Sequence, residues 1–139
     1  MASQKLLDAL NKAIAMDLRA TIQFMWQHVM ALGMDAPGVK DVLKDIAMEE
    51  MKHSEAFAER LYYLGGTPTT TPMPISVGGT LKEMLETDLK IEAETIKQCK
   101  TIIQLAIEDG DPATRLMGEK ILAESEGHED KLQTVLGRR

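Results

Sequence analysis

The chain has 139 residues, of which 44% are hydrophobic and 27% charged, a balance typical of a water-soluble globular protein and not of a disordered or membrane-embedded one. Its length suits a single domain, residues 1–139, with one core. The net charge of −6 argues against a nucleic-acid-binding surface and is compatible with a protein that handles cations.

Targeting signals are absent from the sequence pattern. No apolar run approaches the roughly 20 residues that a helix needs to cross a bilayer. Lys5 is soon followed by Asp8, which does not fit a signal peptide. The single cysteine, Cys99, excludes an internal disulfide framework. We therefore expect a cytoplasmic protein whose partners include neither membrane nor nucleic acid.

Glycine and proline divide the chain into four long segments with a helical period. The first extends from about Ser3 to Leu32. The second starts with Asp35 as the expected N-cap, has Pro37 in its first turn, and ends before Gly65. Neither segment has an interior proline beyond its first turn, so each predicts a long helix.

The second half of the chain repeats this organisation. The third segment opens with Thr80 and Glu83 at the spacing of a capping box and ends near Gly110. The fourth takes Asp111 as N-cap and Pro112 as its first residue, and extends to about residue 136. Both hairpin connections are short, so the helices within each half should be antiparallel neighbours.

Residues 65–79, between the second and third segments, have no helical period and contain three prolines. An extended segment of that length reaches roughly 45 Å at about 3.1 Å per residue, which matches the length of a 30-residue helix. It can therefore carry the chain from one end of a bundle to the other. We predict an all-α four-helix bundle made of two antiparallel hairpins joined by this long crossover.

Polar residues interrupt the apolar stripe near the middle of each predicted helix: Asp17 in the first, Glu50 and His53 in the second, Glu92 in the third, and Ser125 and His128 in the fourth. Buried carboxylates are costly unless they are paired or bound to a metal. The i, i+3 spacing in the second and fourth segments places both side chains on one helix face. The alternative is that some are ordinary buried polar residues, or lie on the surface because the helix phase is misjudged.

A constant offset of 75 residues carries Asp17 onto Glu92, Glu50 onto Ser125, and His53 onto His128. The two hairpins thus read as pseudo-symmetric halves, each contributing half of one site. Carboxylate-bridged di-iron sites in helix bundles are built in this way, from a Glu on each of two helices and Glu-x-x-His on each of the others.

The chain resembles the bacterioferritin branch of the ferritin-like superfamily, on the strength of residues 16–24, 49–53, 88–92 and 124–128. The resemblance implies a ferritin-like bundle that oxidises iron(II) with oxygen or peroxide at a di-iron site and stores it as a ferric mineral. It also implies roles for five residues, with Glu50, His53 and His128 central to catalysis: Glu50 bridges two irons, His53 and His128 each hold one, and Asp17 and Glu92 are terminal ligands.

Met51 stands where the family carries its haem-ligating methionine, at a two-fold subunit interface. The resemblance therefore implies haem b between two chains, although Met51 is also compatible with simple packing because the chain has 10 methionines. It implies a homo-oligomer as well, a dimer at least. Since the sequence ends at Arg139 without the short fifth helix of cage-forming members, a full cage and a smaller assembly both remain open.

Three residues depart from the family pattern. Ser125 replaces the second bridging carboxylate, leaving Glu124, or bound water, hydroxide or phosphate, as candidate substitutes. Asp17 is one methylene shorter than the expected Glu. Phe24 replaces a tyrosine near the di-iron site and can donate neither an electron nor a hydrogen bond. These changes predict impaired ferroxidase chemistry, with one tight and one weaker iron site per chain.

Three functions are therefore compatible with the sequence. The first is an iron-binding, bacterioferritin-like protein that oxidises and stores iron at a modified di-iron site. The second is a non-enzymatic haem- or metal-binding dimer with a degenerate site, which Ser125 and Phe24 favour. The third is another di-metal enzyme, such as a rubrerythrin-like peroxidase, which the missing rubredoxin-type cysteines disfavour.

Overall fold

The computed structural model describes residues 2–138 and contains four helices: α1 (Gln4–Met30), α2 (Ala36–Tyr63), α3 (Leu81–Glu108) and α4 (Pro112–Leu136). No strand occurs within residues 2–138, which confirms the all-α prediction. In the same part of the chain, no helix combines the length and apolarity needed to cross a bilayer.

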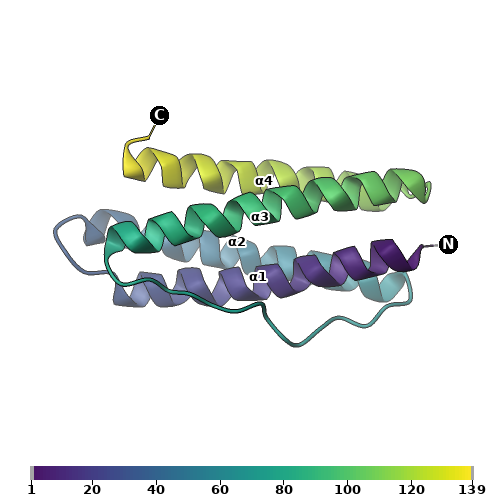
Figure 1. The fold of residues 1–139 in the computed structure, drawn as a ribbon, viewed down its shortest axis with the longest axis horizontal. Helices are drawn as coiled ribbons and strands as arrows, with labels where there is room; N and C mark the ends of the chain where they lie inside the picture. Colours follow the sequence, from purple (N-terminus) through teal and green to yellow (C-terminus); the bar gives the residue numbers. More distant parts are fainter. Residues whose placement is uncertain (1, 139) are drawn as a thin grey trace.

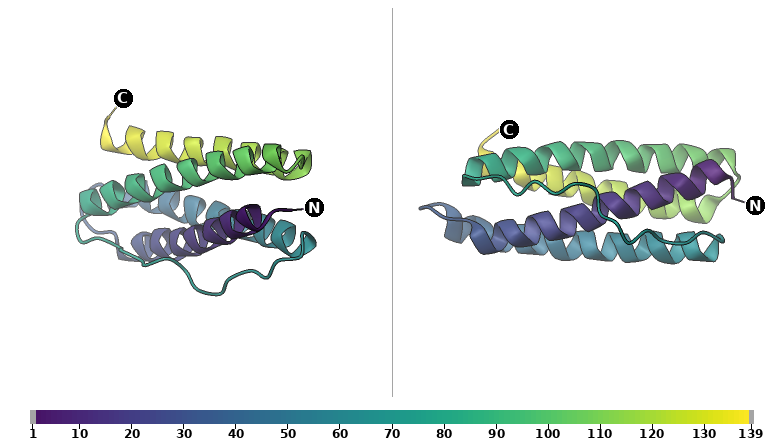
Figure 2. Two further views of the ribbon diagram at one scale, coloured as in Figure 1. Left: turned by 45° about the vertical axis from the view of Figure 1, so that its right-hand side comes forward. Right: turned by 60° about the horizontal axis from the view of Figure 1, so that its bottom comes forward.

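The four helices form two antiparallel hairpins that pack against each other (Figures 1 and 2). α1 and α2 make one layer, α3 and α4 make the other, and α1 also contacts α3. The segment between α2 and α3 passes along α1 from one end of the bundle to the other, so that α2 and α3 run in the same direction (Figure 1). This is the bundle with one long crossover that the proline-rich segment predicts.

Helix boundaries follow the capping signals in the sequence. The Thr80 side chain accepts a hydrogen bond from the Glu83 amide while the Glu83 carboxylate accepts one from the Thr80 amide, completing the predicted capping box. Asp111 accepts from the Thr114 amide at the start of α4. Asp35 precedes α2 as predicted but makes no side-chain cap bond, because its own backbone is helical (φ −86°, ψ −11°) and not extended as capping requires.

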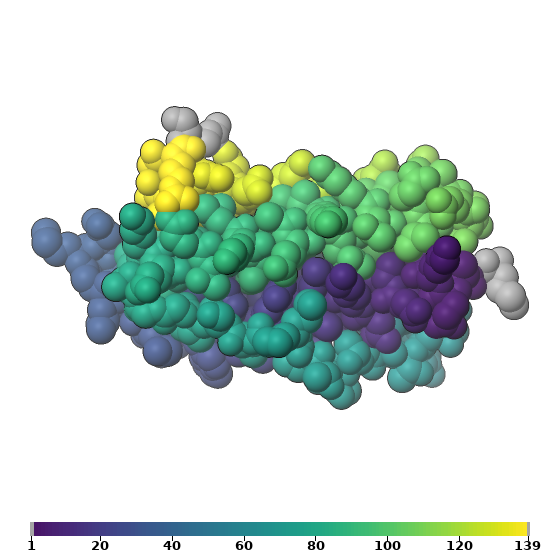
Figure 3. Space-filling view, in the orientation of Figure 1, coloured from purple at the N-terminus to yellow at the C-terminus, as the bar shows by residue number. Residues whose placement is uncertain are grey.

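Hydrogen bonds from α1 hold the crossover in place. The Asn11 side chain donates to the Thr67 carbonyl at 3.0 Å and accepts from the Thr69 amide at 2.7 Å. Further along, Gln27 Nε2 donates to the Val77 carbonyl at 2.8 Å. These bonds keep an extended segment, which has no partner strand, on the surface of α1; the teal crossover lies on that face in the space-filling view (Figure 3).

The core consists of two apolar clusters, one toward each end of the bundle. One includes Phe24, Leu43 and Leu132, and the other includes Leu10 and Phe57. On every helix the residues of one cluster precede, and those of the other follow, the polar positions near the helix centre. The bundle is thus apolar at both ends and polar at one level between them.

Candidate metal centre

All six polar residues that interrupt the apolar stripes are buried in the interior. Their exposed fractions are 4% or less: Asp17 0%, Glu50 0%, His53 4%, Glu92 1%, Ser125 0% and His128 2%. Each of the four helices contributes at least one of them, and the i, i+3 pairs on α2 and α4 face each other. The His53 and His128 rings stack with centroids 5.9 Å apart.

Two groups of potential metal ligands overlap at one residue. Asp17, Glu50 and His53 form the first group, and Glu50, Glu92 and His128 form the second; within each group the ligand atoms lie within 4.8 Å of one another. Glu50 Oε1 lies 2.8 Å from His128 Nδ1 and 3.9 Å from His53 Nδ1. Glu50 therefore stands between the two positions.

The inner atoms of this cluster lack hydrogen-bond partners among the described residues. Both oxygens of Asp17, Glu50 and Glu92 are buried without one, as is Nδ1 of each histidine. The His128 Nδ1–Glu50 Oε1 approach is short, yet it lacks hydrogen-bond geometry. Burial of so many unpaired acceptors is costly, and a shared cation is the usual way to compensate it.

The pKa values of the cluster are shifted by burial and by the neighbouring carboxylates. Burial, followed by the charges of Glu50 and Glu92, raises the pKa of Asp17 well above its usual range. Burial and the Glu50 charge raise the pKa of Glu92 to about 8. Burial alone would lower the pKa of His128, but its contacts with Glu50 and Glu92 raise it to about 10. Asp17, Glu92 and His128 therefore hold their protons to a higher pH than they would in water.

Each histidine has a second carboxylate on its outer nitrogen. Glu124 Oε1 lies 3.4 Å from His53 Nε2, and Glu49 Oε2 lies 3.4 Å from His128 Nε2. Glu124 and Glu49 are 35% and 38% exposed at their side chains, and neither belongs to the two inner groups. The structure thus places the Glu124 carboxylate against the outer nitrogen of His53, and its role as a substitute metal ligand stays a prediction.

The sequence predicts no contact for Glu49. The offset of 75 residues carries Glu49 onto Glu124, but it does not indicate which side chains these carboxylates contact. A second missed residue is Asp88, fully buried one helical turn before Glu92, whose Oδ1 accepts a hydrogen bond from Gln23 Nε2 at 3.0 Å. Its position four residues before Glu92 could have predicted that both carboxylates lie on the same, buried face of α3.

Met51 lies on the outer surface of α2 and is 45% exposed, next to Glu50, which faces inward. Met48, one turn earlier, is 39% exposed, and Trp26 on α1 is 51% exposed. Phe24, by contrast, is fully buried within an apolar cluster.

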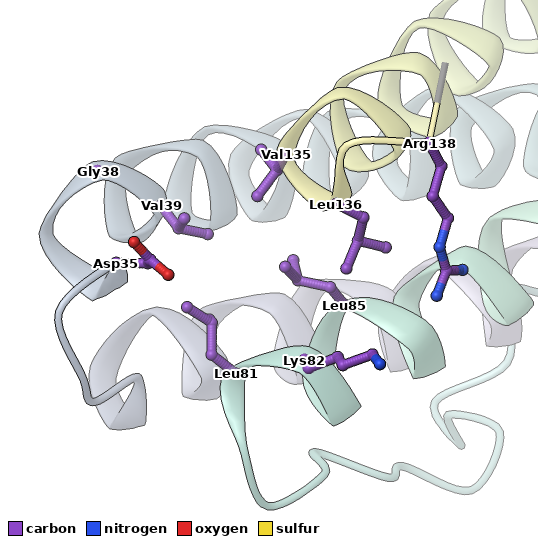
Figure 4. A pocket seen from close by; sticks show the side chains of 9 residues that line it. All are labelled: Asp35, Gly38, Val39, Leu81, Lys82, Leu85, Val135, Leu136 and Arg138. Carbon is purple, nitrogen blue, oxygen red and sulfur yellow. The ribbon is translucent and has the colours of Figure 1, made fainter.

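A surface pocket lies away from this cluster. Its volume is about 540 Å³, and it opens at the end of the bundle where α4 ends and α3 begins (Figure 4). Leu81, Leu85 and Val39 line it together with the charged side chains of Lys82 and Arg138. It contains no group of metal ligands, so the interior cluster is the candidate site.

The donor set of the interior cluster fits a first-row transition metal such as iron, because it combines carboxylate oxygens with imidazole nitrogens. The set supplies three carboxylates and two imidazoles, whereas the di-iron sites of helix bundles have four carboxylates. Ser125 is fully buried three residues before His128 on α4. Cys99 is buried elsewhere on α3 and belongs to neither group.

Comparison with known proteins agrees with this geometry. A family model described as a ferritin-like domain matches residues 7–139. The bacterioferritin of Desulfovibrio desulfuricans is 37% identical over 125 residues, covering 89% of this chain and 70% of its own length. That of Mycolicibacterium paratuberculosis is 31% identical over 133 residues, covering 95% and 84%.

Solved structures agree as well. A ferritin-like, diiron-carboxylate protein from Bacillus anthracis superimposes with a TM-score of 0.93 at 26% identity and covers 96% of both chains. The bacterioferritin of Rhodobacter capsulatus, solved with a metal-free dinuclear site and haem iron, gives a TM-score of 0.86 at 25% identity and covers 96% of this chain and 85% of its own. With the family model spanning nearly the whole sequence and curated relatives above 30% identity, the chain belongs to the ferritin-like family, in its bacterioferritin branch.

Proposed function

We propose that this chain binds two iron ions inside its bundle, where iron(II) gives its electron to oxygen or peroxide, and that the resulting iron(III) is stored. The observation that carries the proposal is Glu50, whose carboxylate is shared by two groups of buried and unpaired ligands. Asp17 and His53 would complete one position, and Glu92 and His128 the other. Iron bound at the two positions supplies the couple between Fe(II) and Fe(III) that the side chains lack.

Two carboxylates outside the inner ligand groups orient the two histidines. Glu124 Oε1 lies 3.4 Å from His53 Nε2 and can accept its proton. Glu49 Oε2 lies at the same distance from His128 Nε2 without hydrogen-bond geometry, and its negative charge favours a proton on that nitrogen. The Nδ1 lone pair of each imidazole is then available on the inner side, toward Glu50. The two outer carboxylates are thus positioning residues, and we assign Glu124 this role in place of the ligand role suggested by its helix phase.

We propose that the two positions bind iron unequally. Asp17 is a methylene shorter than Glu92, and His53 Nδ1 is 3.9 Å from Glu50 whereas His128 Nδ1 is 2.8 Å away. The Glu92–His128 position therefore requires less movement of its ligands to close around an ion. Because Phe24 also cannot donate an electron, oxidation should be slower than at a site with the full family pattern.

The comparisons support a second candidate function, haem binding between two copies. The named Rhodobacter relative holds haem iron, and Met51 presents a thioether at an outer surface that Met48 extends. In a homodimer, the Met51 thioethers of the two copies would hold haem b between them. On this proposal the chain is at least dimeric and resides in the cytoplasm, where iron storage is needed.

Addition of Fe(II) to the metal-free protein in air tests the proposed oxidation. The near-ultraviolet absorbance of protein-bound Fe(III) should rise faster than in buffer alone, and Glu50→Gln should abolish the acceleration. Glu55→Gln, on the exposed side of the same helix, is the matched control and should behave like the wild type. Equal rates in wild type and Glu50→Gln would refute oxidation at this site and leave the non-enzymatic function.

A further inference from the structure

Ser125 carries a buried hydroxyl that nothing in the described chain satisfies. The residue is fully buried on α4, and its Oγ has no hydrogen-bond partner among residues 2–138. Other hydroxyls within these helices bond back to their own backbone, as Thr21, Thr87 and Thr101 do to the carbonyl four residues earlier. The Ser125 hydroxyl is therefore free to bind something else.

Its position is defined by the internal repeat. Ser125 lies three residues before His128, as Glu50 lies three residues before His53, so its side chain starts from the same helix face as the ring of His128. Ser Oγ corresponds to Cγ of a glutamate at that position. Compared with a glutamate, the site thus lacks one carbon and two oxygens, which together make one carboxylate group.

The missing group also leaves the charge unbalanced. Three inner carboxylates face two Fe(II) ions with four positive charges, so one monoanion is lacking. Glu124 does not supply it, because its carboxylate lies against the outer nitrogen of His53. Both carboxylate oxygens of Glu50, on α2, also lack hydrogen-bond partners among the described residues.

We propose that a small external carboxylate-type oxyanion, of the size of formate or hydrogencarbonate, binds beside Ser125 and acts as the missing bridging ligand. This inference rests on the proposed two-metal function. Ser125 Oγ–H would donate a hydrogen bond to the anion, and the two anion oxygens would face the two metal positions opposite Glu50. Iron binding at the weaker position would then depend on the supply of such an anion.

Titration of the metal-free protein with Co(II) in carbonate-free buffer tests the inference, with formate as the probe and chloride at equal ionic strength as its control. Without formate we expect one tight Co(II) per chain and a second bound more weakly. Formate should tighten the second by about tenfold or more, equivalent to about 1.4 kcal/mol. The infrared stretches of bound ¹³C-formate should appear only when Co(II) is present.

Two variants separate the alternatives. Ser125→Glu supplies the carboxylate covalently, so it should bind two Co(II) tightly and show no formate dependence. Glu124→Gln keeps an acceptor for His53 but removes the charge, so Co(II) binding should weaken overall while the fold-tightening by formate stays the same as in the wild type. Two tight sites in carbonate-free buffer, a formate effect that persists in Ser125→Glu, or tightening by phosphate but not formate would overturn the inference. Absence of any bound Co(II) in all variants would instead refute the proposed function itself.

Discussion

Asp88 gives a direct test of how burial determines charge in this bundle. Its carboxyl is fully buried, Oδ1 accepts a hydrogen bond from Gln23, and Oδ2 has no hydrogen-bond partner among the described residues. Burial raises its pKa from 3.8 to about 7, although Gln23 and Gln27 act to lower it. The folded chain therefore keeps a proton on Asp88 that the unfolded chain releases above about pH 4.

The sign and size of the effect follow from this difference. A raised carboxyl pKa means that stability is highest below the unfolded pKa and is lost as the pH rises through the folded pKa. The interval from 3.8 to about 7 corresponds to about 4 kcal/mol, at about 1.4 kcal/mol per pH unit. Asp88→Asn removes the titration while keeping the acceptor for Gln23. Relative to wild type, it should be nearly neutral near pH 4 and should stabilise the fold by about 4 kcal/mol near pH 8.

Urea unfolding of metal-free protein, followed by far-ultraviolet circular dichroism at the two pH values, measures this gain. Asp41→Asn, an exposed aspartate on α2, is the matched control and should show no such pH-dependent gain. The comparison of variant with wild type at each pH cancels the titrations of the remaining groups. If Asp88→Asn were no more stabilising near pH 8 than near pH 4, the assignment of a protonated, desolvated carboxyl would be refuted.

Further predictions concern the ligands, a helix cap and the outer methionine. Glu50→Gln should weaken both Co(II) sites, whereas Asp17→Asn should weaken only one. Isothermal titration calorimetry would show both tight-binding steps affected in the first variant and a single step affected in the second. Asp111→Ala should lower the free energy of unfolding by about 1 kcal/mol because it removes the cap of α4 and the 2.8 Å ion pair with Arg60; Asp8→Ala, exposed on α1, is its control. Met51→Leu should abolish any Soret band formed on haem addition without changing Fe(II) oxidation, and a band of unchanged intensity would exclude Met51 as the ligand.

The fold was predictable from the sequence because its boundaries depend on local chemistry. The Thr80–Glu83 capping box and the Asp111-Pro112 start of α4 act over one helical turn, so the sequence alone specifies them. Asp35 shows where local reasoning stops being sufficient. It is in the predicted position, but the turn that connects α1 and α2 gives it a helical backbone that its side chain cannot cap.

The site was predictable for a different reason, its internal repetition. Buried polar residues recur at an offset of 75, and this regularity survives uncertainty in the phase of any one helix. The roles of Glu49 and Glu124 were not predictable in this way, since they depend on how α2 and α4 are rotated toward each other. Each carboxylate contacts the histidine of the other helix, and that cross-helix relation appears only in the folded chain.

Location of the metal by anomalous X-ray scattering tests the central claim most directly. Crystals soaked in Co(II) should show two peaks inside the bundle on either side of the Glu50 carboxylate, one next to Asp17 and His53 and the other next to Glu92 and His128, the latter at higher occupancy. Peaks confined to exposed carboxylates, with no metal in contact with Glu50, would contradict the account.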